Sequence, residues 1–434
     1  MLGPLFVYPL FIFSCIWSLV RPAIGLIAFY GFVVLDPAWN WRWSIDQTFQ
    51  YQRYIFASLV VGCIPSLFQP WKLAPETRRG LVCLGLFFAF YWVSAQQSIS
   101  PRDTQLFMSV FWKVLLACTL GILFMRDAKY AKLLLLAGLV AQGYNALQIN
   151  LDYFRDGICI WADHDHPWGT KGVRNNGYSL ITLPMLGASL AFGMWETKRI
   201  WKLTFLGIAL LQLHEIMLLS SRGCMLGAVV CLLVTAWKMP RTRANWTLVA
   251  AGVVCIAILA GPSVMSAVKS SFASRDNRDT SADSRLYLWE AGWKITKEHP
   301  LLGVGPNAAR KLVPKSIYYK GGLEQSSKAL HNLYFDVSTS AGLPALACFC
   351  GFIFIPLHFA YKNLTSDNTD VNLTLAATLI GLPGYMFASN FSSGVLFETS
   401  YIPLVATYTA MNAIASNTSR RQPDGAQTHS ALSY

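Results

Sequence analysis

Long apolar runs separated by short polar segments dominate this chain. A helix needs about 20 mostly apolar residues to cross a bilayer. The runs predict spans at residues 5–19, 23–35, 54–68, 80–95, 105–124, 132–149, 177–195, 201–220, 223–237, 246–264, 343–361, 371–388 and 397–416. Arg21-Pro22 separates the first two runs, which are short enough to form a re-entrant pair, so we expect 12 or 13 spans. The first run lacks a basic region before it and a small-residue cleavage site, so we expect it to remain in the membrane.

The composition agrees with this pattern. Apolar residues make up 54% of the 434 positions and charged residues only 13%, and the mean hydropathy is +0.40. Such values are typical of a polytopic membrane protein. We therefore expect an all-α membrane helix bundle with one large loop outside the membrane that carries surface helices.

Basic residues are distributed unequally between alternate short loops. One set of loops holds 16 of them and the opposite set holds 4, and basic loops tend to remain in the cytoplasm. The larger set comprises Arg21, Lys72, Arg78, Arg79, Arg126, Lys129, Lys132, Lys198, Arg199, Lys202, Lys238, Arg241, Arg243, Lys362, Arg420 and Arg421; the smaller comprises Arg42, Arg53, Arg102 and Arg222. This asymmetry predicts a cytoplasmic C-terminus.

The predicted organisation follows from these assignments. It comprises N-terminal membrane helices (1–149), an outside loop (150–176), further membrane helices (177–264), a large outside loop (265–330), C-terminal membrane helices (331–416) and a cytoplasmic tail (417–434). In the large loop we expect a helix that begins at an N-cap, Asp283, and carries an i,i+4 pair, Glu290 and Lys294. Leu286, Trp289 and Trp293 share one stripe, which predicts a helix lying along the membrane surface.

The net charge of +13 does not indicate a nucleic-acid-binding protein. Most of the basic residues are dispersed loop charges, and no recognisable reading module is present. The ten cysteines do not suggest a disulfide framework, because nearly all lie in apolar spans, where they pack as small hydrophobic residues. Cys159 alone is clearly in an outside loop.

Four residues with useful chemistry fall on the same predicted outer face: Arg174, Arg222, Arg285 and His331. Arg222 lies in Ser220-Ser221-Arg222-Gly223, between two apolar spans with almost no room for a loop. An arginine at the bilayer centre costs about 2.5–3.5 kcal/mol even on the lenient insertion scale, so such a residue either snorkels to the interface or faces a polar cavity. The small neighbours favour a close-packed turn in which Arg222 points inward.

For each of the other three residues a role without catalytic function is also open. Arg174 precedes a span and could be a solvated loop charge. Arg285 lies near the start of the surface helix, where a guanidinium could bind phosphate oxygens bidentately or simply contact solvent. His331 directly adjoins a membrane span; its pKa of about 6.5 suits a general base, although a single histidine is more often structural.

The run Asp163-His164-Asp165-His166 resembles a metal-binding cluster. Adjacent loop residues cannot all turn toward one ion, however, and no further spaced ligand set accompanies them. We therefore interpret the run as a solvated loop, and we expect no metal and no cofactor.

The motifs in this order resemble the O-antigen ligase and polymerase superfamily, whose members are multi-spanning glycosyltransferases of the bacterial inner membrane. The resemblance covers roughly residues 170–400. It rests on Ser221-Arg222-Gly223, on Ser284-Arg285 with Trp289, on the run His299-Pro-Leu-Leu-Gly-Val-Gly-Pro306, on His331-Asn332-Leu-Tyr334 and on Ala341-Gly-Leu-Pro344. The N-terminal third, with Arg21-Pro-Ala-Ile-Gly25 and Asp36-Pro37, looks like the O-glycosylation ligases associated with exosortase systems. An acidic residue would be expected there where Arg174 stands.

The resemblance implies a mechanism and a location. The active site faces the periplasm, and a glycan on undecaprenyl pyrophosphate enters from the outer leaflet. Arg222 and Arg285, with Arg174 as a third candidate, hold the pyrophosphate; His331 deprotonates the acceptor hydroxyl, and Ser221 and Asn332 support the site. The anomeric centre inverts, and paired guanidiniums take the charge-stabilising part that metals often play, so metal independence is expected.

Three alternatives remain open at this stage. A repeat-unit polymerase or a protein O-oligosaccharyltransferase would use the same groups, and the acceptor could be a lipid A core sugar, a protein hydroxyl or another glycan. A transporter of small anions or inorganic carbon belongs to a different class. A transporter should place charges at the bilayer midplane on broken helices, whereas Lys113 is the clearest mid-span charge here and the other charges collect at one face.

Overall fold

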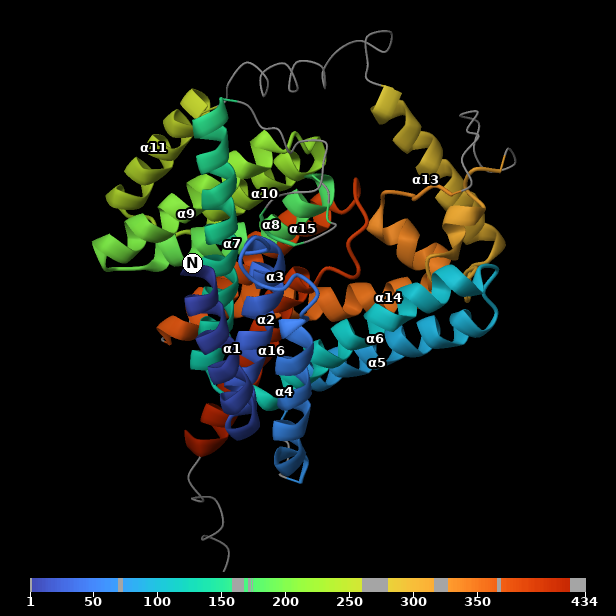
Figure 1. Cartoon of the computed structure of the whole chain (residues 1–434), viewed down its shortest axis with the longest axis horizontal. Coiled ribbons are helices and arrows are strands. Elements are labelled where there is room, and N and C mark those ends of the chain that lie inside the picture. Colours follow the sequence, from blue (N-terminus) through green and yellow to red (C-terminus); the bar gives the residue numbers. More distant parts are fainter. Residues whose placement is uncertain are drawn as a thin grey trace, which may run out of the picture.

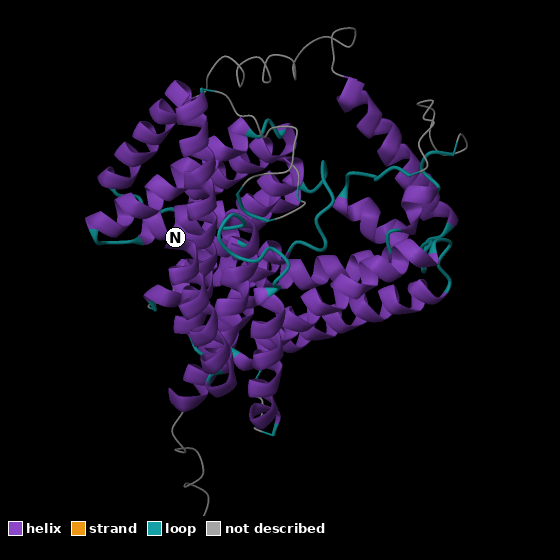
Figure 2. Ribbon diagram, viewed as in Figure 1, coloured by secondary structure: helices purple, strands orange, loops and turns teal. Residues whose placement is uncertain are grey.

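The computed structural model describes residues 2–68, 73–157, 168–170, 173, 175–259, 280–315, 327–364 and 368–421. Over these residues the fold is helical and contains no strand (Figure 2). The helices are α1 (Leu2–Val20), α2 (Pro22–Leu35), α3 (Pro37–Asn40), α4 (Tyr51–Leu67), α5 (Pro75–Gln96), α6 (Pro101–Phe124), α7 (Ala128–Asp156), α8 (Asn175–Trp195), α9 (Arg199–Leu218), α10 (Arg222–Lys238), α11 (Arg243–Leu259), α13 (Thr280–Glu298), η2 (Ala308–Lys311), α14 (Leu333–Asn363), α15 (Thr369–Ala388), η3 (Glu398–Ser400) and α16 (Tyr401–Arg421). The prediction of an all-α polytopic membrane protein is confirmed.

Eight of the described helical segments are long and apolar enough to cross a membrane: α1, α2 continued through α3, α5, α6, α8, α9, α14 and α15. Helices α4, α10 and α11 are shorter, with 17 residues each. The number of 12 or 13 spans therefore stays a prediction. Large apolar side chains such as Leu5, Val61 and Phe354 are exposed on these helices, as expected for surfaces that contact lipid.

Helix α8 forms the centre of the bundle. Nearly all of its residues are buried, and it packs along α15, α9 and α7. Gly187 of α8 lies directly against Gly381 of α15, so that a Cβ on Gly187 would overlap the backbone of α15. Small residues allow such close approach between membrane helices, where packing supplies much of the association energy.

A second group of helices extends to one side of this bundle. Helix α14 runs beside α5, which pairs with α6, and α13 packs on α14 (Figure 1). Helix α13 begins at Thr280, so Asp283 lies inside the helix and the predicted N-cap is wrong. The predicted ion pair is present, with Lys294 Nζ 3.1 Å from Glu290 Oε1.

Helix α13 carries two apolar stripes. Leu288, Ala291 and Ile295 are buried where the helix packs on the rest of the protein, whereas Leu286 and Trp293 of the predicted stripe are 54% and 49% exposed. The exposed apolar side chains lie on the outer surface of the helix. That this stripe lies along the membrane surface stays a prediction.

Two helices run past the predicted ends of their membrane spans, whose positions stay predictions. Helix α7 continues from the expected membrane boundary at residue 149 to Asp156; Arg155 pairs there with Asp152 at 3.1 Å, and Gly157 ends the helix with φ 72°. Helix α16 runs to Arg421, past the predicted start of the tail at 417.

Candidate functional site

Two sequence motifs lock α14 against the chain that follows α13. The amide of Leu343 donates to Pro300 O at 2.7 Å, and the amide of Val304 donates to Thr339 O at 2.8 Å. Gly342 breaks the helical backbone with φ 86°, and a Cβ there would overlap the carbonyl of Leu301. The glycine- and proline-rich run of 299–306 thus holds the N-terminal part of α14 in place through backbone hydrogen bonds.

His331 occupies the short connection into α14. Its backbone has φ 52°, a left-handed conformation unusual for a residue other than glycine. The next residue, Asn332, is the N-cap: its Oδ1 accepts from the amides of Tyr334 at 3.0 Å and Phe335 at 3.1 Å. Its Nδ2 donates to Asn390 O at 3.2 Å. Asn332 therefore fixes the backbone between His331 and the first turn of α14, and its supporting role in the site stays a prediction.

Arg222 lies at the first position of α10, directly after a tight turn. Ser220 has φ 53°, and Ser221, which is buried, occupies the N-cap position without a side-chain cap. Gly223 lies against Phe391, where a Cβ would approach the phenyl side chain to 2.7 Å. The expected close-packed turn is present, because Gly223 leaves room for Phe391.

Phe391 connects this turn with the surface helix. The guanidinium of Arg285 lies 5.8 Å from the centre of the Phe391 ring, within the range of a cation–π contact. Trp289, one turn further along α13, is 5.7 Å from the same ring. Phe391 belongs to the non-helical segment 389–397 between α15 and η3, so this segment positions both arginines.

The charged groups influence one another across these elements. Burial lowers the pKa of Arg285, and the nearby positive charge of Arg222 lowers it further. His331 remains exposed as a residue, yet loss of solvent around its ring lowers the pKa of the imidazole, as do the charges of Arg285, Lys328 and Arg310. Because the pKa lies below 6.5, the imidazole is mostly neutral at pH 7 and can accept a proton. Arginine remains charged throughout this range.

The fold therefore brings three of the four predicted residues together. We call Arg222, Arg285, Lys328 and His331 the cationic cluster. Arg174 lies outside the described residues, and its role stays a prediction; the nearby carbonyl of Asn176 accepts from Cys224 Sγ of α10 at 3.6 Å. The start of α8 is thus beside the cluster.

Sequence reasoning missed Lys328, Arg310 and the segment 389–397. The amide of Lys328 donates to Arg310 O at 2.9 Å, which holds residues 327–330 against η2. The sequence could have indicated Lys328 and Arg310, because they lie in a loop predicted to be outside the membrane, whereas basic residues usually concentrate in cytoplasmic loops. Phe391 carried no comparable signal in the sequence.

The question of a metal site is open. The described part of the chain contains no group of three histidine, cysteine, aspartate or glutamate side chains placed to hold an ion. The run from Asp163 to His166 lies outside the described residues, so both its interpretation as a solvated loop and the metal independence of the site stay predictions.

Comparison with known proteins gives a family for the segment that contains the site. The O-antigen ligase family matches residues 207–350, which include Arg222, Arg285 and His331. An uncharacterized protein of Haemophilus influenzae is 24% identical over 119 residues, which cover 27% of this chain and 30% of that protein. The chain thus aligns with less than a third of the length of that curated relative. Over residues 207–350 the chain is thus similar to the O-antigen ligase family, with the motifs in the predicted order.

Proposed function

We propose that the protein is an inverting glycosyltransferase that moves a glycan from undecaprenyl pyrophosphate to an acceptor hydroxyl at the periplasmic face of the bacterial inner membrane. The observation that supports this most strongly is the convergence of Arg222 and Arg285, from separate helices, beside a histidine with a lowered pKa. Like charges are brought together only at a cost. An anionic ligand with more than one phosphate group would repay that cost.

The chemistry of the step matches these groups. The His331 nitrogen takes the proton of the acceptor hydroxyl, and the acceptor oxygen forms a bond with the anomeric carbon. The bond between that carbon and the pyrophosphate oxygen breaks, and the electron pair leaves with undecaprenyl pyrophosphate. Arg222 and Arg285 neutralise the charge that develops on the leaving group, which requires no rearrangement when the donors are already in place.

The acceptor distinguishes three variants of this function. A lipid A core sugar would make the protein an O-antigen ligase, another glycan chain a polymerase, and a protein hydroxyl an O-oligosaccharyltransferase. The family match supports the ligase or polymerase type. The cationic cluster would serve all three equally well.

A deletion strain tests the function directly. Loss of the gene should remove a surface glycan and cause its lipid-linked precursor to accumulate, and the wild-type gene should restore it whereas Arg222→Ala should not. Accumulated full-length glycan would indicate a ligase, and accumulated single repeat units would indicate a polymerase. An unchanged set of surface glycans and lipid-linked precursors would contradict a glycosyltransferase.

The periplasmic location needs a separate test. The loops at 97–100, 219–222 and 327–331 should label from outside, since the unequal distribution of short-loop basic residues predicts it. In a variant without other reactive cysteines, Ser327→Cys should react with a membrane-impermeant thiol reagent added to the periplasmic side. Labelling from the cytoplasmic side alone would overturn the topology and the donor route together.

A further inference from the structure

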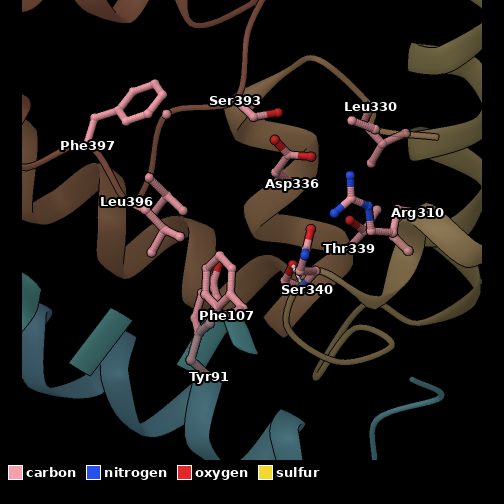
Figure 3. A pocket seen from close by; sticks show the side chains of 15 residues that line it. Tyr91, Phe107, Arg310, Leu330, Asp336, Thr339, Ser340, Ser393, Leu396 and Phe397 are labelled. Atoms are coloured by element: carbon pink, nitrogen blue, oxygen red, sulfur yellow. Dashed lines mark hydrogen bonds between the residues drawn. The ribbon is translucent and has the colours of Figure 1, made fainter. Parts of the chain in front are cut away.

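A cavity of about 240 Å³ lies next to the cationic cluster. Its wall includes Leu330, which directly precedes His331, and Arg310, whose charge acts on His331. The cavity is enclosed by five parts of the chain: the ends of α5 and α6 that face each other, η2, residues 329–330, the first turns of α14, and the segment 393–397 (Figure 3). Segment 389–397 therefore contributes to both sites.

Polar atoms without protein partners line this cavity. Asp336 Oδ2, Arg310 Nε and Ser393 Oγ are buried without a well-formed hydrogen bond within the described chain, although the Ser393 hydroxyl lies close to the Asp336 carboxylate. Figure 3 shows the Asp336 carboxylate and the Ser393 hydroxyl on one side of the space, with the Arg310 guanidinium extending toward them. Buried polar groups are nearly always satisfied, so polar atoms with hydrogen-bonding capacity left over in one cavity indicate a ligand or water that binds there.

Aromatic rings form the other side of the cavity. Tyr91 and Phe107 lie in parallel, with ring centres 5.7 Å apart, and Phe397 projects from the opposite wall. The lining thus combines flat apolar faces with a carboxylate that only accepts, a guanidinium that only donates and a hydroxyl that does both. This combination suits a ring whose hydroxyls need donors and acceptors while its C–H face packs on an aromatic ring.

Size and charge narrow the ligand further. The volume is below the roughly 300–1,000 Å³ of pockets for drug-sized ligands. One acidic and one basic side chain leave the cavity without a net charge, in contrast to the cationic cluster. A phosphate would meet the carboxylate of Asp336, so an uncharged ring of monosaccharide size fits better.

We propose that the cavity lined by Arg310, Asp336 and Ser393 is a carbohydrate subsite that holds one uncharged sugar ring beside His331. The proposal rests on the proposed function and adds the chemical class that the second site takes. The ring belongs either to the donor glycan or to a glycan acceptor, since both must bring a sugar near His331. The carboxylate and the guanidinium would fix its hydroxyls, and the rings would support its apolar face.

Steady-state kinetics with purified full-length protein, a lipid-linked glycan donor and a glycan acceptor test the proposal. Asp336→Asn keeps the shape but weakens charge-assisted hydrogen bonding, so the KM for the sugar that occupies the cavity should rise about ten- to hundredfold, with a smaller change in kcat. A rise in the acceptor KM assigns the cavity to the acceptor, and a rise in the donor KM assigns it to the donor. Asp370→Asn is the matched control. Asp370 lies in α15, does not line the cavity and pairs with Lys132 of α7 at 2.8 Å. This variant should leave both KM values unchanged.

A second variant and a binding assay separate the subsite from a folding defect and from failure of the proposed function. Ser393→Leu should fill the space, and saturation-transfer NMR with methyl glycosides of neutral hexoses should show contact with wild-type protein that this variant and Asp336→Asn lose. This binding test needs no transfer activity, so it stands even if the protein proves not to be a glycosyltransferase. Wild-type protein without glycoside contact, or a folded Asp336→Asn protein with both KM values unchanged, would overturn the subsite. Saturation-transfer contact with a peptide but with no glycoside would also overturn the subsite.

Discussion

The cationic cluster and the adjoining cavity share the segment 389–397 but have opposite electrostatic character. In the cluster, Arg285 lies over the ring of Phe391 and close enough to Arg222 for that charge to lower the pKa of Arg285. The cavity sets one guanidinium, Arg310, against one carboxylate, Asp336. On the proposed function, the difference corresponds to the two chemistries of a lipid-linked glycan: the charged cluster suits a pyrophosphate, and the neutral cavity suits a sugar ring.

Replacing His331 should produce the largest effect, because it is the proposed general base of the cationic cluster and adjoins the cavity. His331→Ala should lower transfer by about 100- to 10,000-fold, the range of general acid–base catalysis, with little change in donor binding. His331→Gln should keep the fold but not the activity. Transfer and donor binding measured separately test this; wild-type turnover, or a defect confined to donor binding, would reassign His331 to a structural role.

The pH dependence of the same step follows from the direction of the pKa shift. Burial and three neighbouring positive charges lower the pKa of His331, so the neutral base persists below pH 6.5. The rate should stay level from neutral pH downward and fall only below that value, where imidazolium replaces imidazole. A fall centred above pH 6.5 would contradict the effect of Arg285, Lys328 and Arg310 on this ring.

Removing an arginine from the cluster should come next in size. Arg222→Ala and Arg285→Ala should each reduce transfer by about 100- to 1,000-fold, as loss of one charge-stabilising donor does elsewhere. Lysine should rescue poorly, since a point charge lacks the bidentate fork of a guanidinium. Arg243→Ala, at the start of α11, is the control and should be neutral. Near-normal activity of either lysine variant would exclude bidentate clamping by that residue.

Much of this fold and part of this site could be predicted from the sequence. The apolar runs predicted most membrane helices, and the order of the motifs singled out Arg222, Arg285 and His331, which the fold brings together. Asp336 was hidden because it stands inside an apolar helix and acquires meaning only when η2 brings Arg310 opposite it. Phe391 was hidden because a phenylalanine after an apolar run looks like one more lipid-facing residue. Both depend on tertiary contacts that periodicity does not encode.

Loss of the cap at Asn332 should have a moderate effect that reaches both regions. Asn332→Ala removes two hydrogen bonds to the first turn of α14 and should destabilise that helix start by about 1 kcal/mol. His331 and Asp336 would both move, so KM and kcat should change together by several-fold. Asn332→Asp, which retains the cap acceptor, should recover most of the activity in the same assay. Full activity of the alanine variant would show that the cap does not position His331.

Chelation of metal ions should produce the smallest effect. It tests whether the arginines of the cationic cluster or a bound metal supply the positive charge for the leaving group. If Arg222 and Arg285 supply the positive charge for the leaving pyrophosphate, excess EDTA should leave the rate of purified enzyme with lipid-linked donor unchanged. The comparison becomes sharper with Arg285→Ala, because a divalent cation added to that variant could then replace part of the missing charge and raise its residual rate. Wild-type activity that EDTA removes and one particular metal restores would instead make the run from Asp163 to His166 a ligand set. The two guanidiniums would then position the donor while the metal carries the charge of the leaving group.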